Sequence, residues 1–310
     1  MPHNSFPMLK KNNKKSRISR LSVTQNAELL DFLTSTIKDK NRTKLKGMLA
    51  RKQFMVNNTI TKQFNFELKK GDVVKVSWDK PFKEMSYQGV TIVFEDDDVI
   101  VVDKKSGLLS ISTGNPKVQT VYKTIKHHVQ LDDPMATIFV VHRLDKDTSG
   151  LMVLAKNKNS QIALQKTWDK TIAKRKYLAV TEGTFKEDVG TIDNYLKENK
   201  ALVMYVTNNP KEAKKAVTHY EVIKKNEYYT LLEAYQETER KNQLRVHLKS
   251  LGHPIIGDKK YESKVNPIGR MAMHLKQLVF IHPTTKKEVS FETKVPDDYL
   301  KLFRSKYYEG

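Results

Sequence analysis

Apolar and polar positions alternate along the chain with two different periods, which predict both helices and strands. Residues 28–37, ELLDFLTSTI, are apolar at intervals of three and four, the spacing of a helix with one buried face. Residues 90–104, VTIVFEDDDVIVVDK, contain two apolar runs on either side of three aspartates, as expected of two strands joined by a turn. Strands outnumber helices and do not alternate with them regularly. We therefore predict an α+β fold with a large mixed, mainly antiparallel sheet.

Changes in composition and pattern divide the chain into four segments. Residues 1–24 carry six Lys and Arg and no Asp or Glu, so we expect a disordered basic arm, with a solvated tail of no specific role as the alternative. Residues 25–78 contain two helix patterns and a closing strand pattern after Gly71, as expected of a small α/β domain. Residues 79–90, DKPFKEMSYQGV, are predicted to be a linker. Residues 91–310 are predicted to form one large domain around the main sheet.

The charge of the chain indicates a polyanionic partner. Its 56 Lys and Arg exceed its 35 Asp and Glu, which gives a net charge of +21. An excess of this size favours nucleic acid as the partner, and a basic enzyme without that role is the alternative. The absence of cysteine excludes disulfides, thiolate metal sites and cysteine nucleophiles. No apolar run approaches the roughly 20 residues that span a bilayer, so we expect a cytoplasmic protein without a membrane partner.

The stretch HRLDKDTSG at residues 142–150 is the strongest candidate for a functional site. A calcium loop that began at Asp145 would need a glutamate at its twelfth position, where the chain has Lys156. A metal site built on His142 and Asp145 lacks a further ligand at a suitable spacing. Local chemistry alone therefore favours an ordinary polar turn between strands. The combination of this stretch with others leads to a different interpretation.

Four stretches resemble the motifs of the RluA-type pseudouridine synthases, in the same order. Residues 142–157, HRLDKDTSGLMVLAKN, match H-R-L-D-x-x-T-S-G-L at every fixed position. Residues 101–110 resemble the V-V-x-K-P-x-G-L strand, and residues 174–180 the K-x-Y-x-A segment. Residues 237–261 resemble the block T-G-R-x-x-Q-I-R-V-H that continues to L-G-H-P-I-x-G-D-x-x-Y. The resemblance covers about residues 90–300 and implies an RNA pseudouridine synthase with the fold of that family.

The chain departs from these motifs at four positions. Lys105 stands in place of the proline, Glu239 in place of the glycine, and Lys241 and Asn242 in place of the commoner T-H. None of the four is a residue to which the resemblance gives a chemical role. Glycine at position 239 can supply a positive φ, so the substitution leaves the backbone conformation at Glu239 open. We interpret these changes as variation within the family.

The resemblance implies roles for individual residues. Asp145 is implied to be the catalytic nucleophile or general base, and Arg245 to pair with it and keep it ionised. Tyr177 is implied to stack on the uracil or to take part in proton transfer at its carbon 5. Arg143 is implied to enter the RNA stack when the target nucleotide is flipped out, with a phosphate contact as the alternative. For Asp258 we expect a structural role in a turn. The remaining candidates for substrate binding are His142, Thr148, Arg240 and Gln243.

Residues 25–78 resemble the ribosomal S-four-like RNA-binding module. The similarity lies in MVNN at 55–58, LKKGDVVKV at 68–76 and a basic second helix. Because this module often accompanies enzymes of the family that act on ribosomal RNA, the resemblance implies large-subunit ribosomal RNA as the substrate. Transfer RNA is the alternative substrate, and a small helical cap without an RNA role is the alternative for the module.

The sequence predicts neither a cofactor nor a metal. It contains no G-x-G-x-x-G and no stretch with the spacing of a phosphate loop. We expect the protein to act as a monomer on RNA. A non-catalytic RNA-binding or ribosome-assembly protein is the second hypothesis, and Asp145 argues against it, because a degenerate relative is expected to lose its nucleophile first.

Overall fold

The structure, a computed structural model, describes residues 17–304 apart from residues 58, 83–85, 113, 115, 116 and 132. The chain divides into two compact units, Met1–Met85 and Ser86–Gly310. Residues 1–16 of the predicted basic arm and residues 83–85 of the predicted linker lie outside the described residues. No helix in the described part of the chain has the length and apolar character needed to cross a lipid bilayer.

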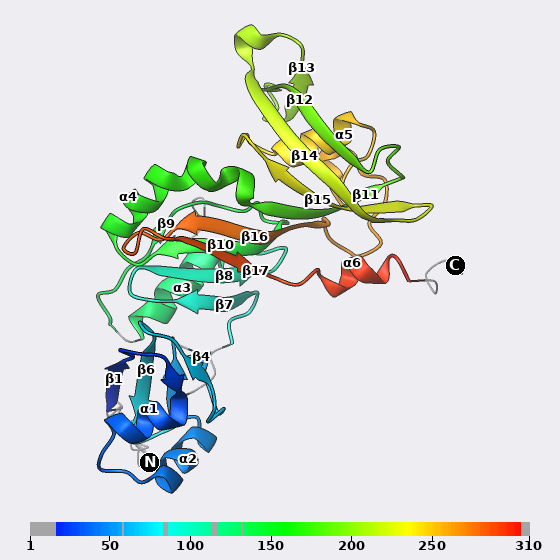
Figure 1. The fold of residues 1–310 in the computed structure, drawn as a ribbon. Helices are drawn as coiled ribbons and strands as arrows, with labels where there is room; N and C mark the ends of the chain where they lie inside the picture. Colours follow the sequence, from blue (N-terminus) through cyan, green and yellow to red (C-terminus); the bar gives the residue numbers. More distant parts are fainter. Residues whose placement is uncertain are drawn as a thin grey trace, which may run out of the picture. The chain divides into compact units, whose positions relative to one another are not determined.

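The first unit packs two helices against a four-stranded sheet with the order β1-β6-β3-β4 (Figure 1). The apolar positions that predicted the first helix, Leu29, Leu30 and Leu33, are all buried in its core. The second helix begins at Arg42 and is capped by Asn41, whose side chain accepts a hydrogen bond from the backbone N–H of Lys44. The elements are β1 (Ile18–Ser22), β2 (Ala27–Glu28), α1 (Leu29–Thr36), α2 (Arg42–Ala50), β3 (Phe54–Val56), β4 (Thr59–Ile60), β5 (Glu67–Leu68) and β6 (Val73–Ser77).

Strand β1 corrects the prediction that residues 1–24 form a disordered arm. Ile18–Ser22 pair in antiparallel fashion with Val73–Ser77 of β6. Leu21 also packs against the apolar core of the unit. These ladder hydrogen bonds and this apolar contact order a stretch whose own composition indicates disorder, because they come from a partner strand far along the chain.

The second unit is built on an 11-stranded sheet with the order β13-β12-β14-β15-β11-β16-β10-β8-β7, to which β17 adds beside β16 and β9 beside β10 (Figure 1). Its strand pairs are antiparallel except for β10 and β16, which run parallel. The predicted α+β class with a large, mainly antiparallel sheet is therefore confirmed. The strands are β7 (Val90–Glu95), β8 (Val99–Lys104), β9 (Phe139–Val140), β10 (Ser149–Ala155), β11 (Lys176–Glu182), β12 (Val189–Glu198), β13 (Met204–Thr207), β14 (Lys214–Lys225), β15 (Tyr229–Gln236), β16 (Met273–Ile281) and β17 (Glu288–Glu292).

Two large apolar cores lie along this sheet, and a smaller cluster with Leu196 and Met204 lies at its β13 end. Its helices are α3 (Val121–Gln130), α4 (Lys158–Thr167), α5 (Gln243–Ser250) and α6 (Asp297–Lys301). Ile125 of α3 and Leu164 of α4 belong to a core that they share with β8 and β10. Leu244 of α5 and Tyr299 of α6 belong to a second core with β11 and β15. Tyr177 at the start of β11 packs against both cores, so it lies where the two halves of the unit meet.

The parallel contact between β10 and β16 requires a glycine. Ser149 pairs with His274 and Gly150 with Leu275. Gly150 has a φ of 116°, and a Cβ at this position would lie 2.3 Å from the carbonyl oxygen of Leu275. The close approach of the two strands fixes the end of the HRLDKDTSG stretch against the centre of the sheet.

A buried carboxylate joins β7, α3 and the end of β10. Glu95 Oε2 lies 2.7 Å from His128 Nε2, and Glu95 Oε1 accepts a hydrogen bond of 2.7 Å from Lys156 Nζ. Burial opposes the ionised form, but the hydrogen bond with His128 and the positive charge of Lys156 outweigh it and lower the pKa of Glu95 from 4.5 to about 2. The ionised carboxylate therefore stabilises the folded unit at neutral pH.

We predict that Glu95→Gln lowers the free energy of unfolding by about 2–3 kcal/mol at pH 7, because the charge-assisted hydrogen bonds of a buried carboxylate are lost. The contribution of Glu95 is complete above pH 4.5 and is lost as the pH falls toward 2, so the difference between variant and wild type should shrink at pH 3. Urea unfolding of the variant and the wild type at pH 7 and at pH 3 measures this difference in the free energy of unfolding. Glu221→Gln, at an exposed position of β14, is the control and should change little. An equal loss in both variants would contradict the prediction.

Candidate active site

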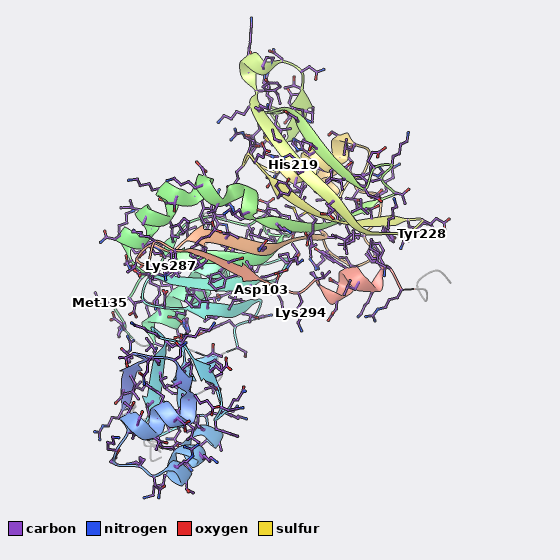
Figure 2. All side chains as sticks on the ribbon, viewed as in Figure 1. Asp103, Met135, His219, Tyr228, Lys287 and Lys294 are labelled. Atoms are coloured by element: carbon purple, nitrogen blue, oxygen red, sulfur yellow. The ribbon has the colours of Figure 1, made fainter. Side chains whose placement is uncertain are left out.

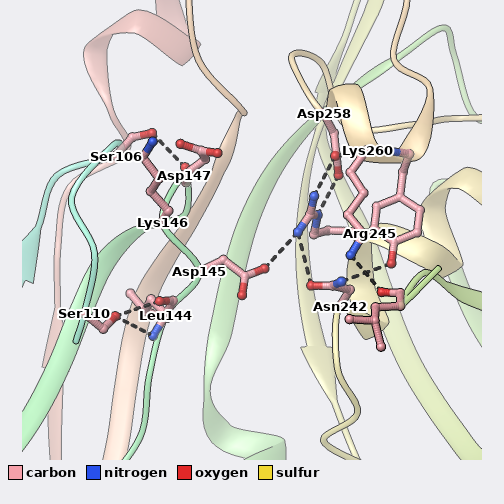
Figure 3. Close-up of polar contacts among 12 residues, drawn as sticks. Ser106, Ser110, Leu144, Asp145, Lys146, Asp147, Asn242, Arg245, Asp258 and Lys260 are labelled. Carbon is pink, nitrogen blue, oxygen red and sulfur yellow. Dashed lines mark hydrogen bonds and ion pairs between the residues drawn. The ribbon is translucent and has the colours of Figure 1, made fainter. Parts of the chain in front are cut away.

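The loop between β9 and β10 carries Asp145, and side chains from the end of β8 and the segment after it hold the backbone of this loop (Figure 3). Three side chains, two hydroxyls and one ammonium group, donate hydrogen bonds to the backbone carbonyl oxygens of Leu144, Lys146 and Asp147. Because the backbone on both sides is fixed in this way, the loop presents Asp145 in one orientation. The bonds run from Ser110 Oγ to Leu144 (2.6 Å), from Lys104 Nζ to Lys146 (2.9 Å) and from Ser106 Oγ to Asp147 (2.7 Å).

Lys104 is a positioning residue that the sequence analysis did not single out. Its side chain is fully buried, and its ammonium group donates to the carbonyl oxygens of Lys105, Leu108 and Lys146. Burial lowers the pKa of Lys104 to about 8, although the nearby carboxylates of Asp147 and Asp145 act in the opposite direction. The lysine of the V-V-x-K motif was the available signal, and its role becomes clear only from the three carbonyls that surround it.

Arg245 of α5 lies opposite Asp145, 100 residues further along the chain (Figure 3). Its Nη1 donates to Asp145 Oδ2 at 2.9 Å, while its Nε and Nη2 donate to the two carboxylate oxygens of Asp258 at 2.7 Å each. Its Nη1 also donates to Asn242 Oδ1 at 3.1 Å, and its guanidinium carbon lies 4.9 Å from the centre of the Tyr261 ring. The expected pair of Asp145 and Arg245 is thus brought together, and Asp145 Oδ1 accepts no hydrogen bond from any described residue.

Asp258 is the partner of Arg245 that the sequence analysis missed. The expected structural role in a turn is confirmed, because Asp258 Oδ1 accepts a hydrogen bond from the backbone N–H of Tyr261. In addition, the side chain of Asp258 is 1% exposed and binds the guanidinium through both oxygens. Burial opposes the charge of Arg245, yet the hydrogen bonds and charge of Asp258 raise the pKa of the guanidinium above its ordinary value. The acidic residue that follows P-I-x-G in the same motif block was the signal that could have identified this pair.

A pocket of about 650 Å³ surrounds Asp145, within the roughly 300–1,000 Å³ typical of small-molecule sites. It is lined by the loop of Asp145, by Tyr177 of β11, by Trp168 and by residues 239–245. Burial and the nearby carboxylate of Glu239 raise the pKa of Tyr177, so its phenol is protonated at neutral pH. All of these residues belong to the second unit.

The other predicted candidates differ in their surroundings. Arg143 is exposed at the pocket, and no described residue forms a hydrogen bond or ion pair with it. Thr148 is buried against the pocket. His142 accepts a hydrogen bond from the backbone N–H of Val153, and burial lowers its pKa to about 3, so its imidazole is neutral. Arg240 lines the pocket while its Nε donates to the backbone of β14.

Gln243 holds the turn before α5 together and has no free hydrogen-bonding group. Its Nε2 donates to the Val217 carbonyl and to Thr218 Oγ1, and its Oε1 accepts from Thr238 Oγ1 and from the backbone N–H of Arg240. Since an amide has two donors and two acceptor positions, the direct contact with RNA that we expected from Gln243 is not available to it. Its contribution to the site is to position the backbone.

The backbone at Glu239 does not need the positive φ that a glycine could supply. The residue of this turn with a positive φ is Asn242, at 55°, directly before α5. Asparagine adopts this conformation more readily than most residues. Asn242 therefore both forms the turn and orients Arg245, which resolves the question that the substitution at 239 had raised.

Comparison with known proteins adds independent information. The family model described as RNA pseudouridylate synthase matches residues 98–250. The "Uncharacterized RNA pseudouridine synthase YlyB" of Bacillus subtilis is 33% identical over 292 residues, which cover 92% of this chain and 96% of that protein. The "Ribosomal large subunit pseudouridine synthase D" of Vibrio cholerae is 31% identical over 281 residues, which cover 85% of this chain and 86% of that protein.

Two solved structures share the fold. Human RNA Pseudouridylate Synthase Domain Containing 4 superposes with a TM-score of 0.56 at 24% identity, covering 67% of this chain and 90% of the human chain. Human RNA Pseudouridylate Synthase Domain Containing 1 superposes with a TM-score of 0.57 at 23% identity, covering 72% of this chain and 90% of the human chain. The sequence identity to the bacterial relatives extends over nearly the whole of each protein, and the chain belongs to the RNA pseudouridine synthase family.

Proposed function

We propose that this enzyme is an RluA-type pseudouridine synthase that acts on large-subunit ribosomal RNA and uses Asp145 as its nucleophile or general base. The observation that carries the proposal is the placement of Asp145 in a pocket with one carboxylate oxygen bound to Arg245. The motifs of residues 101–110 and 237–261 support the assignment, because they supply the side chains that fix Asp145 and Arg245.

Pseudouridine formation detaches uracil from its ribose, turns it and rejoins it through carbon 5. In the proposed mechanism the free Oδ1 of Asp145 attacks the ribose or removes a proton from it as the glycosidic bond breaks. Nη1 of Arg245 donates to the other carboxylate oxygen, Oδ2, at 2.9 Å and in this way orients Asp145 for the reaction. The reaction needs no change of oxidation state, and the proton lost from carbon 5 as the new bond forms is balanced by the proton that N1 gains, so no cofactor is invoked.

The target nucleotide must leave the RNA stack to reach Asp145, at an unstacking cost of a few kcal/mol. We assign to Arg143 the space that the base vacates, because its guanidinium is exposed beside Asp145 and is not engaged by any described residue. We assign to Tyr177 a stacking contact with the detached uracil. Its raised pKa disfavours the phenolate, so stacking is preferred over proton removal from carbon 5.

Ribosomal RNA is the proposed substrate because two relatives at 30–31% identity are named as large-subunit pseudouridine synthases. We further propose that the first unit is an S-four-like RNA-binding module. Residues 17–82 contain 14 Lys and Arg against six Asp and Glu, and α2 exposes Arg42, Lys44 and Lys46. A basic helix of this kind contacts phosphates without reading the sequence.

Asp145→Asn is expected to reduce tritium release from RNA labelled at carbon 5 of uracil by about 10³-fold or more, because a carboxamide can neither attack the ribose nor accept its proton. The assay compares ribosomal with transfer RNA, without added metal. Asp147→Asn, two residues away with its carboxylate outside the pocket, is the control and should retain activity. Equal activity of Asp145→Asn and wild type would refute the assignment, and release from transfer RNA alone would change the proposed substrate.

Asp258→Asn is expected to lower kcat on the order of 10²-fold while RNA binding changes little, because Arg245 loses the charged partner that orients it. Single-turnover rates and a binding titration separate the two effects. Asp188→Asn, which breaks the exposed pair with Lys225, is the matched control and should leave kcat unchanged. A loss of binding with an unchanged rate would show that Asp258 serves the RNA surface instead.

The double substitution Lys44→Gln and Lys46→Gln in the full chain is expected to reduce the slope of log affinity against log salt by about 1–2, because each phosphate contact contributes roughly 0.7–0.9. Binding to ribosomal RNA fragments is measured between low and physiological salt. The control is the double substitution Lys224→Gln and Lys225→Gln, at the last two residues of β14. If both pairs gave the same slope, the first unit would have no special role in RNA binding.

A further inference from the structure

Two departures from the family motifs meet beside the pocket. Glu239 stands where the family has glycine. Arg175 is a fifth departure, beyond the four named in the sequence analysis, because it stands two residues before Tyr177, where the K-x-Y motif has its lysine. Nη1 of Arg175 lies 3.4 Å from Glu239 Oε2, so the two unusual residues form a pair although they are 64 residues apart. The pair connects the start of β11 to the turn before α5, next to Tyr177.

Arg175 is fixed in place by the residues behind the pocket wall. It is 4% exposed, its guanidinium carbon lies 4.4 Å from the centre of the Trp168 ring, and Nη2 donates to the Trp168 carbonyl. The Trp168 ring in turn packs against the ring of His142 at 4.6 Å. Arg175 is therefore a rigid cation, and its Nε finds no hydrogen-bond partner among the described residues.

Glu239 is held much more loosely. Its side chain is 45% exposed and lines the pocket. The long contact with Arg175 is the one hydrogen bond that the described residues make to its carboxylate. A carboxylate that keeps acceptor capacity at a pocket wall can bind a donor on a ligand.

The charge of the pocket decides what kind of donor this is. Among the residues that line the pocket, Asp145 and Glu239 are acidic. The basic residues of the lining are Arg143, Lys146, Arg240, Lys241 and Arg245. Asp145 is paired with Arg245, whereas Glu239 is 45% exposed at the wall of the pocket. A carboxylate repels phosphates and base carbonyls, so it favours only a hydrogen-bond donor. Exocyclic amino groups are donors that Glu and Asp bind on bases, and they distinguish guanosine, adenosine and cytidine from uridine, whose one base donor is the ring N3–H.

We propose that Glu239 is a specificity-determining residue that accepts a hydrogen bond from the exocyclic amino group of a nucleotide flanking the target uridine. Arg175 fixes the position of the Glu239 carboxylate. The flanking base donates its hydrogen bond to the side of this carboxylate that is exposed. A family member with glycine at this position has no acceptor there. The inference rests on the proposed function, because it needs a flipped uridine at Asp145 and a neighbouring nucleotide at the wall of the pocket.

The test uses the full-length enzyme and a fragment of the RNA that it modifies. Each flanking nucleotide is replaced in turn by an analogue without its amino group: inosine for guanosine, purine riboside for adenosine, pyrimidin-2-one riboside for cytidine. We expect one replacement to lower kcat/KM of the wild type about 5- to 100-fold. Glu239→Gly should bring the ratio of the two substrates close to 1. The ratio does not depend on the folded fraction of the variant, so a purely structural role of Glu239 would not change it.

Glu237→Gln is the matched control, because this carboxylate is exposed, lies outside the pocket and pairs with His219. Figure 2 labels His219 on β14. It should keep the preference of the wild type. The proposal is overturned if Glu239→Gly retains the wild-type ratio, if no replacement affects the wild type, or if the modified uridine has only uridine neighbours. Absence of tritium release from every RNA by the wild type is a different result, which would refute the proposed function itself.

Discussion

The guanidinium of Arg245 is shared by two carboxylates, and the geometry of the site depends on how unequal that sharing is. Asp258 is buried and takes two bonds of 2.7 Å, whereas Asp145 is half exposed and takes one bond of 2.9 Å. A buried cation without a partner would be strongly unfavourable, and Asp258 removes that penalty. Arg245 can then orient Asp145 without neutralising it completely. One oxygen of Asp145 remains available to a substrate.

The two sides of this contact are supported by different halves of the sheet. The loop of Asp145 is fixed by Lys104 and Ser110 and joins β10, which belongs to the first core of the unit. Arg245 lies on α5, which packs into the second core. Both cores contact Tyr177, and the sheet is continuous between them. The distance between Asp145 and Arg245 is therefore set by the rigidity of the whole sheet rather than by the two side chains.

The sequence was sufficient for the fold class and for the residues that carry a motif, because period and motif are both local properties. Asp145, Arg245 and Tyr177 were identified in this way, and the pocket brings them together. The roles of Lys104 and Asp258 could not be derived, because a positioning role depends on partners that lie far away in sequence. For the same reason β1 was assigned to a disordered arm and Gln243 to the RNA. In each case the missing information was a hydrogen-bonding partner from another element.

The parallel pairing of β10 with β16 has a consequence for the order in which the protein is made. Ser149 and Gly150 leave the ribosome long before their partners His274 and Leu275 are synthesised. Until then β10, the strand that follows Asp145, can pair only with its antiparallel neighbours β8 and β9. Asp258, which binds Arg245, is synthesised only shortly before β16. The first unit, with its separate core, is complete much earlier. A growing chain thus displays the basic surface of the first unit while the pocket is still incomplete, and the pocket can be finished only after β16 has been synthesised.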